Sequence, residues 1–199
     1  MRMRNIVKRN AAATIALIAT LSMGVLWAES KHEINAASGI HSWELHDQGA
    51  GFTLMQITPD QARAFFLARG FDRSAVDYYA SSCVFMTIVR NEGKETIINN
   101  LADWRVIRKG VKLENLKLAS DWLVEWKQRK VAASSLIAFE WSQFPQLQSF
   151  EGGDWNQGMT TYTMPSGSAF DLNFVWKKNG EKHEATLANI QCAGIESDR

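Results

Sequence analysis

The sequence predicts a mainly β protein that folds as a single antiparallel β-sandwich with two short helices. Phe170, Leu172, Phe174 and Trp176 stand at alternate positions with polar residues at 171 and 173, which is typical of a strand with one buried face. Asn179-Gly180 follows, and this dipeptide favours a tight hairpin turn because both positions need positive φ. With 199 residues, 46% apolar and 22% charged, the chain has the composition of one ordinary globular domain.

The amino-terminal segment has the pattern of a secretory signal peptide. Met1–Asn10 is basic, and the eighteen residues from Ala11 to Ala28 carry no charge. Small side chains at Ala28 and Ser30 predict cleavage before Lys31, so that residues 1–30 are removed. The alternative is an uncleaved membrane-anchor helix, which would be the only membrane contact. Either way, we expect the rest of the chain outside the cytoplasm: periplasmic or secreted, or anchored in the inner membrane and facing the periplasm.

The charge balance argues against nucleic-acid binding. Removing residues 1–30 takes away four bases and one acid, which leaves 18 bases and 20 acids and a formal charge of −2. Sequence-independent binding to nucleic acid needs a dense basic surface that displaces counterions. We therefore expect no nucleic-acid partner.

Cys83 and Cys192 are the two cysteines of the chain. An even number in an exported protein predicts a disulfide, here between the first and last strands of the sandwich. The alternative is one reactive thiol that works with a histidine.

The first half of the mature chain is expected to combine an arm, a strand and a helix. Residues 31–51 are polar and are interpreted as an amino-terminal arm leading into an early strand, and 52–57 are predicted to form a strand. A helix begins after Thr58, which caps it, and ends at Gly70. A second short helix or turn is expected near 74–79.

From residue 83 onward the pattern changes mostly to strands. Asn91–Gly93 supplies a turn between strands at 83–90 and 95–99, which predicts a hairpin. Further strands are expected at 104–108, 111–118, 148–150 and 159–164, the first two joined by a turn at 109–110.

One further helix and one central strand complete this half. Ser120 and Asp121 cap a helix at 122–130, in which Trp122 and Trp126 form the inner face. Residues 134–141 are apolar on both faces, which predicts a central strand.

The final hairpin has a defined register. Pairing across Asn179-Gly180 sets Phe174 opposite Ala185 and Leu172 opposite Leu187. A bulge near 188–189 is needed to keep the following apolar residues on the inner face.

Many short strands joined by hairpins, with an inter-strand disulfide and a buried tryptophan, describe an antiparallel sandwich. The general shape resembles an immunoglobulin-like domain carrying two helices. The resemblance is architectural, because true immunoglobulin domains place their cysteines closer together than these two. The expected division is 1–30 signal peptide or anchor, 31–51 arm, and 52–199 sandwich.

Catalytic motifs are absent from the sequence. There is no G-x-S-x-G, phosphate loop or dinucleotide fingerprint, and none of C-x-x-C, H-x-x-x-H or H-E-x-x-H occurs. We therefore expect no enzyme activity.

One metal hypothesis remains, and it concerns copper. Histidines crowd the mature amino terminus and methionines are spread through the body, and imidazole and thioether groups suit copper. The alternative is solvated histidines and core methionines. The candidate ligands are His41, His46, Met159 and Met164.

The strongest candidate for recognition is a predicted loop at 152–159. It combines a tryptophan, glycines and directional polar groups, a mixture that suits binding of a protein, peptide or sugar. The alternative is a tryptophan folded back into the end of the sandwich. Its candidate residues are Asp154, Trp155, Asn156, Gln157 and Met159.

These observations predict a non-catalytic exported protein that recognises another envelope protein or a membrane complex. A periplasmic copper-binding or copper-delivery protein is the alternative, and carbohydrate binding is a third reading from composition alone. No resident cofactor is expected other than the possible copper ion.

Overall fold

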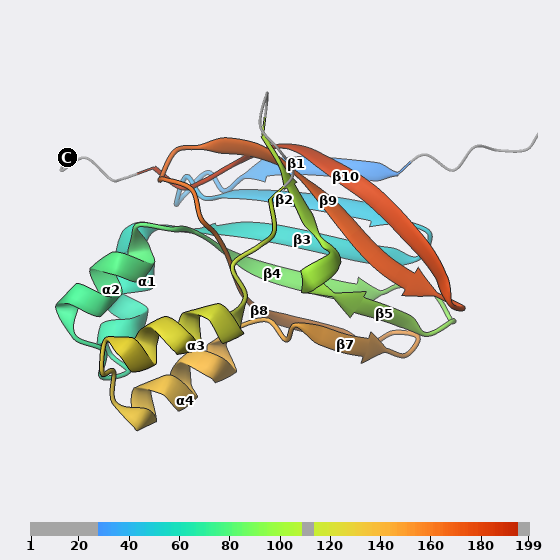
Figure 1. Cartoon of the computed structure of the whole chain (residues 1–199). Coiled ribbons are helices and arrows are strands. Elements are labelled where there is room, and N and C mark those ends of the chain that lie inside the picture. Colours follow the sequence, from blue (N-terminus) through green and yellow to red (C-terminus); the bar gives the residue numbers. More distant parts are fainter. Residues whose placement is uncertain (1–27, 109–113, 195–199) are drawn as a thin grey trace, which may run out of the picture.

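The structure is a computed structural model that describes residues 28–108 and 114–194. In this part of the chain, ten strands form two antiparallel sheets, accompanied by four α-helices (Figure 1). Sheet A contains, in spatial order, β1 (Glu29–Ile34), β2 (His41–Asp47), β3 (Ala50–Ile57), β4 (Cys83–Asn91) and β8 (Trp155–Tyr162). Sheet B contains β10 (Glu181–Gln191), β9 (Ala169–Lys178), β5 (Ile97–Asn100) and β7 (Leu147–Phe150), with β6 (Arg105–Ile107) paired to β9. The predicted mainly β class is confirmed.

The two sheets face each other across an aromatic core. Phe52 of sheet A stacks on Phe174 of sheet B with ring centroids 4.5 Å apart, and Trp176 packs beside them at 5.3 Å. Further along the core, Phe85 of β4 meets Phe170 of β9. Burial of large aromatic side chains from both sheets is the main source of stability in such an arrangement.

The carboxy-terminal hairpin forms as predicted. Asn179 and Gly180 both have positive φ, and Phe174 pairs with Ala185 as Leu172 does with Leu187. The register shifts between Leu187 and Ile190, where the bulge was expected.

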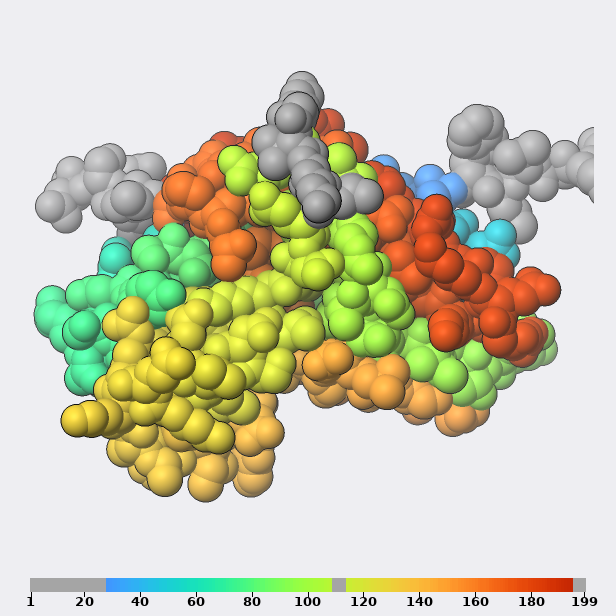
Figure 2. All heavy atoms as spheres, viewed as in Figure 1, coloured from blue at the N-terminus to red at the C-terminus, as the bar shows by residue number. Residues whose placement is uncertain are grey.

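The four α-helices lie together at one end of the sheets (Figure 1), where their atoms form a projecting lobe (Figure 2). They are α1 (Pro59–Leu67), α2 (Arg73–Ala80), α3 (Ala119–Gln128) and α4 (Ala133–Ser142). Helices are present at the predicted positions 59–69, 74–79 and 122–130, and Thr58 caps α1 by accepting a hydrogen bond from the Gln61 amide at 3.2 Å. The predicted caps of the third helix are wrong, because α3 begins at Ala119 and therefore includes Ser120 and Asp121. The four helices also exceed the two short helices of the predicted fold. The predicted core role of Trp122 and Trp126 is also confirmed, because both are buried and stacked at 5.0 Å.

The central strand expected at 134–141 is wrong, because these residues form α4. The run has one buried face at helical spacing, Ser135 and Phe139, whereas Ile137 and Trp141 are exposed. A short apolar run has no periodicity that separates a buried strand from a helix, and here tertiary packing selects the helix.

The hairpin expected between 83–90 and 95–99 is also wrong. β4 belongs to sheet A and β5 to sheet B, so the chain crosses between the sheets at this point. The Asn91 side chain holds the crossing, because its amide donates to the carbonyls of Glu95 (2.7 Å) and Phe150 (2.9 Å). These bonds replace those of a hairpin turn.

Two other predictions concern the turn at 109–110 and the arm at 31–51. The turn at 109–110 lies outside the described residues, although Val106 and Glu114 on either side form an antiparallel bridge. Residues 31–51, interpreted as an arm, provide β1 and β2 at the edge of sheet A. Within residues 28–108 and 114–194, no helix combines the length and the apolar character needed to cross a bilayer.

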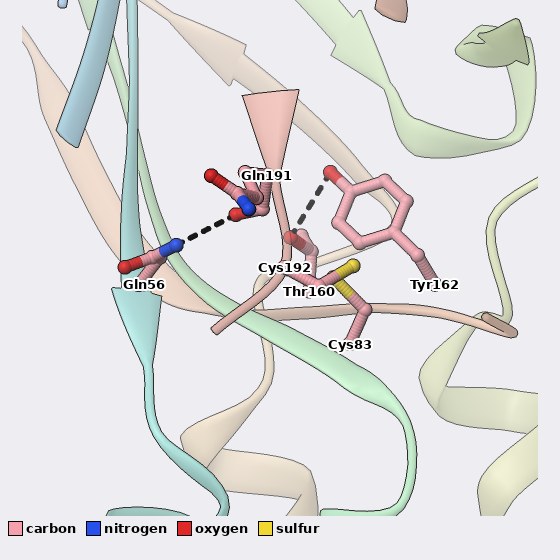
Figure 3. The surroundings of a disulfide bond; sticks show 6 residues. All are labelled: Gln56, Cys83, Thr160, Tyr162, Gln191 and Cys192. Carbon is pink, nitrogen blue, oxygen red and sulfur yellow. Dashed lines mark hydrogen bonds between the residues drawn. A yellow bond between two sulfur atoms is a disulfide. The ribbon is translucent and has the colours of Figure 1, made fainter. Parts of the chain in front are cut away.

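The predicted disulfide between Cys83 and Cys192 is present, with Cα atoms 5.3 Å apart (Figure 3). Cys83 begins β4 rather than the first strand, and Cys192 directly follows β10. Near this bond the Gln56 side-chain amide donates to the Gln191 carbonyl at 2.8 Å. The disulfide therefore joins β4 of sheet A to the end of the last strand of the chain, β10.

Candidate functional site

Trp155, the centre of the predicted recognition loop, is the first residue of β8. The turn before it occupies residues 151–154, so the loop is shorter than expected. Trp155 is 53% exposed, and the Arg90 guanidinium lies 5.1 Å from its ring centroid. The partly exposed ring expected at this position is thus present, on a strand rather than on a loop.

The polar neighbours of Trp155 are engaged within the protein. The Glu151 amide donates to the Asp154 carboxylate at 2.9 Å, which fixes the turn. The Asn156 side-chain amide donates to Gln148 at 2.6 Å, and Gln157 is exposed beside it. Met159 is buried against the helical lobe, away from Trp155.

The four candidate copper ligands are not brought together. His46 hydrogen-bonds to the Glu92 carboxylate at 3.0 Å, which raises the pKa of His46 above its ordinary value. Met159 packs in the helical lobe and Met164 in the core between the sheets. His41 instead lies beside His32, with 3.0 Å between His41 Nδ1 and His32 Nε2. Across the described ranges, no three histidine, cysteine or acidic side chains are grouped closely enough to hold a metal ion.

The outer face of sheet A carries a hollow with a volume of about 960 Å³. Its floor contains three methionines that are directly opposed on neighbouring strands. Met55 of β3 pairs with Met86 of β4, and Met86 pairs with Met159 of β8. Because alternate residues of a strand point to opposite faces, all three side chains lie on the face turned away from the core between the sheets. We call this hollow the methionine groove.

Two walls enclose the methionine groove. Phe65 and Gln61 of α1 form one wall, and Ile34 and Ile40, which flank the turn between β1 and β2, belong to the other. Phe65 is held in place by Arg69, whose guanidinium lies 3.3 Å from the ring centroid. The groove is therefore built on regular elements with apolar side chains on its floor and both walls.

The charged residues that line the groove are both acidic. Glu33 forms an ion pair with Lys31 at 2.6 Å. Glu44 has His46 as its nearest basic neighbour in the described part of the chain, at 3.8 Å. A carboxylate at the margin of an apolar floor favours a ligand that presents a positive charge at that point.

Trp155 belongs to the same outer face. Along β8, Trp155, Gln157 and Met159 point to this side, and Trp155 is paired with Arg90 as Met159 is with Met86. The groove and the exposed tryptophan thus form two ends of one surface, which we call the outer surface of sheet A.

The sequence does not predict that the three methionines lie opposite one another on neighbouring strands. Met55 and Met86 each alternate with core residues, which indicates only that they sit on the opposite face of a strand. Their opposition depends on the register between β3, β4 and β8, and a single sequence carries no signal for it. Trp141 on α4 is 86% exposed, whereas the predicted central strand at 134–141 would have buried it.

We expect Trp155→Ala to lower the free energy of unfolding by less than about 1 kcal/mol, because the ring is half exposed and its main described partner is a cation–π contact with Arg90. Urea unfolding of this variant beside the unchanged protein measures the effect. A loss of about 3–5 kcal/mol, as for a core tryptophan, would contradict the placement of Trp155 on a recognition surface.

Likeness to other proteins does not assign a function to this chain. No protein family, curated protein or solved structure with which it was compared matches it. The methionine groove, the exposed Trp155 and the histidine pair are therefore the features from which its function is inferred.

Proposed function

We propose that the protein is a non-catalytic binding protein that acts outside the cytoplasm and recognises a segment of another envelope protein. The segment is apolar along one face and carries a basic residue next to it. The observation that carries this proposal is the methionine groove, which joins an apolar floor to an acidic edge.

The floor suits an apolar segment of variable shape. Methionine is unbranched and polarisable, so a methionine-lined surface adapts to different apolar partners. Met55 is 41% exposed at the middle of sheet A, where a solvated face would ordinarily carry a polar residue. Exposed apolar side chains that line a hollow, here Met55 and Ile34, are a feature of interaction sites in soluble domains.

The charge of the groove selects the orientation of its partner. Glu44 of β2 is the cross-strand partner of Thr53 of β3, and it lies at the margin of the methionine floor. A lysine or arginine next to the apolar face of the partner would meet this carboxylate, whereas an acidic residue would be repelled. Trp155, on the same surface, supplies a second aromatic contact of the type that often dominates binding energy.

The proposed location is the periplasm or the outside of the cell. The disulfide supports it, because structural disulfides persist in oxidising compartments. The basic and apolar start of the sequence supports it independently.

We also propose that the two sheets form an immunoglobulin-like sandwich in the architectural sense. Aromatic contacts such as Phe52–Phe174 join the inner faces of the sheets, and the disulfide links β4 of sheet A to the residue that follows β10 of sheet B. In such domains rigid sheets support recognition surfaces, which is the role proposed here for sheet A.

A synthetic amphipathic helical peptide of leucine and lysine tests the function. We expect it to bind the intact protein, and the matching peptide of leucine and glutamate to bind more weakly. Met55→Asp, which places a charge on the groove floor, should weaken lysine-peptide binding by at least about 1.4 kcal/mol, or tenfold, as for a binding hot spot. Isothermal titration calorimetry measures each affinity.

Ile98→Asp is the matched control. Ile98 is 42% exposed, close to the 41% of Met55, but it lies on β5 of sheet B. The Ile98→Asp variant should leave peptide binding unchanged. Glu44→Lys should reverse the preference between the two peptides. Equal loss from Met55→Asp and Ile98→Asp, or no difference between the peptides, would overturn the proposal.

A further inference from the structure

We propose that His32 and His41 form a two-histidine site for a divalent copper ion on the edge of sheet A. This site is separate from the methionine groove and does not depend on the function proposed for it. It also differs from the ligand set expected from the sequence, because it excludes His46 and both methionines.

The distance between the two ring nitrogens fits one shared ion. His32 Nε2 and His41 Nδ1 are 3.0 Å apart. Two imidazole nitrogens that each lie about 2.0 Å from a metal, at an angle of about 90–109°, are separated by about 2.8–3.3 Å. The same distance permits an N–H···N hydrogen bond between the rings while no ion is bound.

The surroundings position the His32 ring and the His41 backbone. His32 stacks on the buried Trp43 with centroids 4.8 Å apart and planes 14° apart. The His41 backbone amide donates to Gln56 Oε1 at 3.1 Å, and Gln56 in turn donates to the Gln191 carbonyl. The ligands therefore come from two paired strands whose positions are set before an ion arrives.

The chemistry favours copper. Imidazole is a good ligand for Cu(II), Ni(II) and Zn(II), and Cu(II) binds most tightly among them in a site that imposes no special geometry. Both residues are exposed or half-buried, so water or a group from a partner can complete the coordination. An ion held by His32 of β1 and His41 of β2 would fix the edge strand β1, whose described pairing is with β2.

Titration with Cu(II) sulfate tests the site. We expect one Cu(II) per chain, with an electron paramagnetic resonance spectrum that shows nitrogen ligands, and with partial quenching of tryptophan fluorescence because Trp43 lies next to the ion. His32→Phe and His41→Phe each keep an aromatic ring beside Trp43 but remove the ligand nitrogens, so each should abolish the site. Circular dichroism verifies that both variants remain folded.

His183→Phe is the matched control, because His183 also stacks on a buried tryptophan, Trp176, with centroids 5.7 Å apart. This variant and His46→Phe should bind Cu(II) like the unchanged protein. Loss of binding in His32→Phe alone would assign the ion to the amino-terminal end of the chain and overturn the pair. Loss in His46→Phe, or no binding by the unchanged protein in the presence of glycine as a weak competitor, would also overturn it.

Discussion

Replacing Cys83 and Cys192 together by alanine is expected to lower the free energy of unfolding by about 4–5 kcal/mol. The two residues are separated by 109 positions, and cross-linking so long a loop removes much of the conformational entropy of the unfolded chain. Both side chains are buried, so the variant also loses sulfur packing between the sheets. A loss of this size is a large fraction of the stability of a domain.

Urea unfolding of three samples checks this expectation: the oxidised protein, the same protein reduced with dithiothreitol, and the double alanine variant. The reduced protein and the variant should unfold at similar urea concentrations, both well below the oxidised protein. Dithiothreitol should leave the variant unchanged, which controls for effects of the reagent. A variant as stable as the oxidised protein, or two freely alkylated cysteines in protein taken from its native compartment, would contradict a structural role for the bond.

Trp122→Ala is expected to lower the free energy of unfolding by about 3–5 kcal/mol. The indole is buried where α3 meets sheet A, and its Nε1 donates to Thr161 Oγ1 at 2.6 Å. The Lys117 ammonium lies 3.5 Å from the centroid of the Trp122 ring. Truncation would leave a cavity, remove a donor from a buried hydroxyl and remove the stacking contact with Trp126.

Trp141→Ala is the control for this variant, since Trp141 also lies in a helix of the same lobe but is 86% exposed. It should change stability by less than about 0.5 kcal/mol. If the helical lobe unfolds separately from the sheets, Trp122→Ala should shift the earlier of two transitions. Equal effects of the two substitutions would contradict the burial of Trp122 against β8.

The parts of the fold that could be predicted depend on local signals. The Asn179-Gly180 turn set the register of the last hairpin, and the Thr58 cap marked the start of α1, because each acts through neighbouring residues. The α4 helix could not be distinguished, since its apolar residues fit either period. The crossing after β4 depends on Asn91 reaching the Phe150 carbonyl, a contact between residues far apart in sequence.

The candidate site was less predictable, because it also depends on contacts between residues far apart in sequence. Trp155 could be selected by residue type alone, and its partial exposure agrees with that choice. The methionine row requires the register of three strands, one of which, β8, is distant from the others in sequence. His32 and His41 meet only because β1 pairs with β2 in a region that the sequence suggested was an arm.

The late position of β8 also determines the order in which the protein can fold. A chain leaves the ribosome or a translocation pore amino terminus first, so β1 to β4 become available before their last neighbour. Until Trp155–Tyr162 emerges, the hydrogen-bonding groups along one side of β4 have no native partner, and an open strand edge is prone to pair with other chains. The time needed to deliver the helices and β5 to β7 therefore sets how long a nascent molecule remains vulnerable to aggregation.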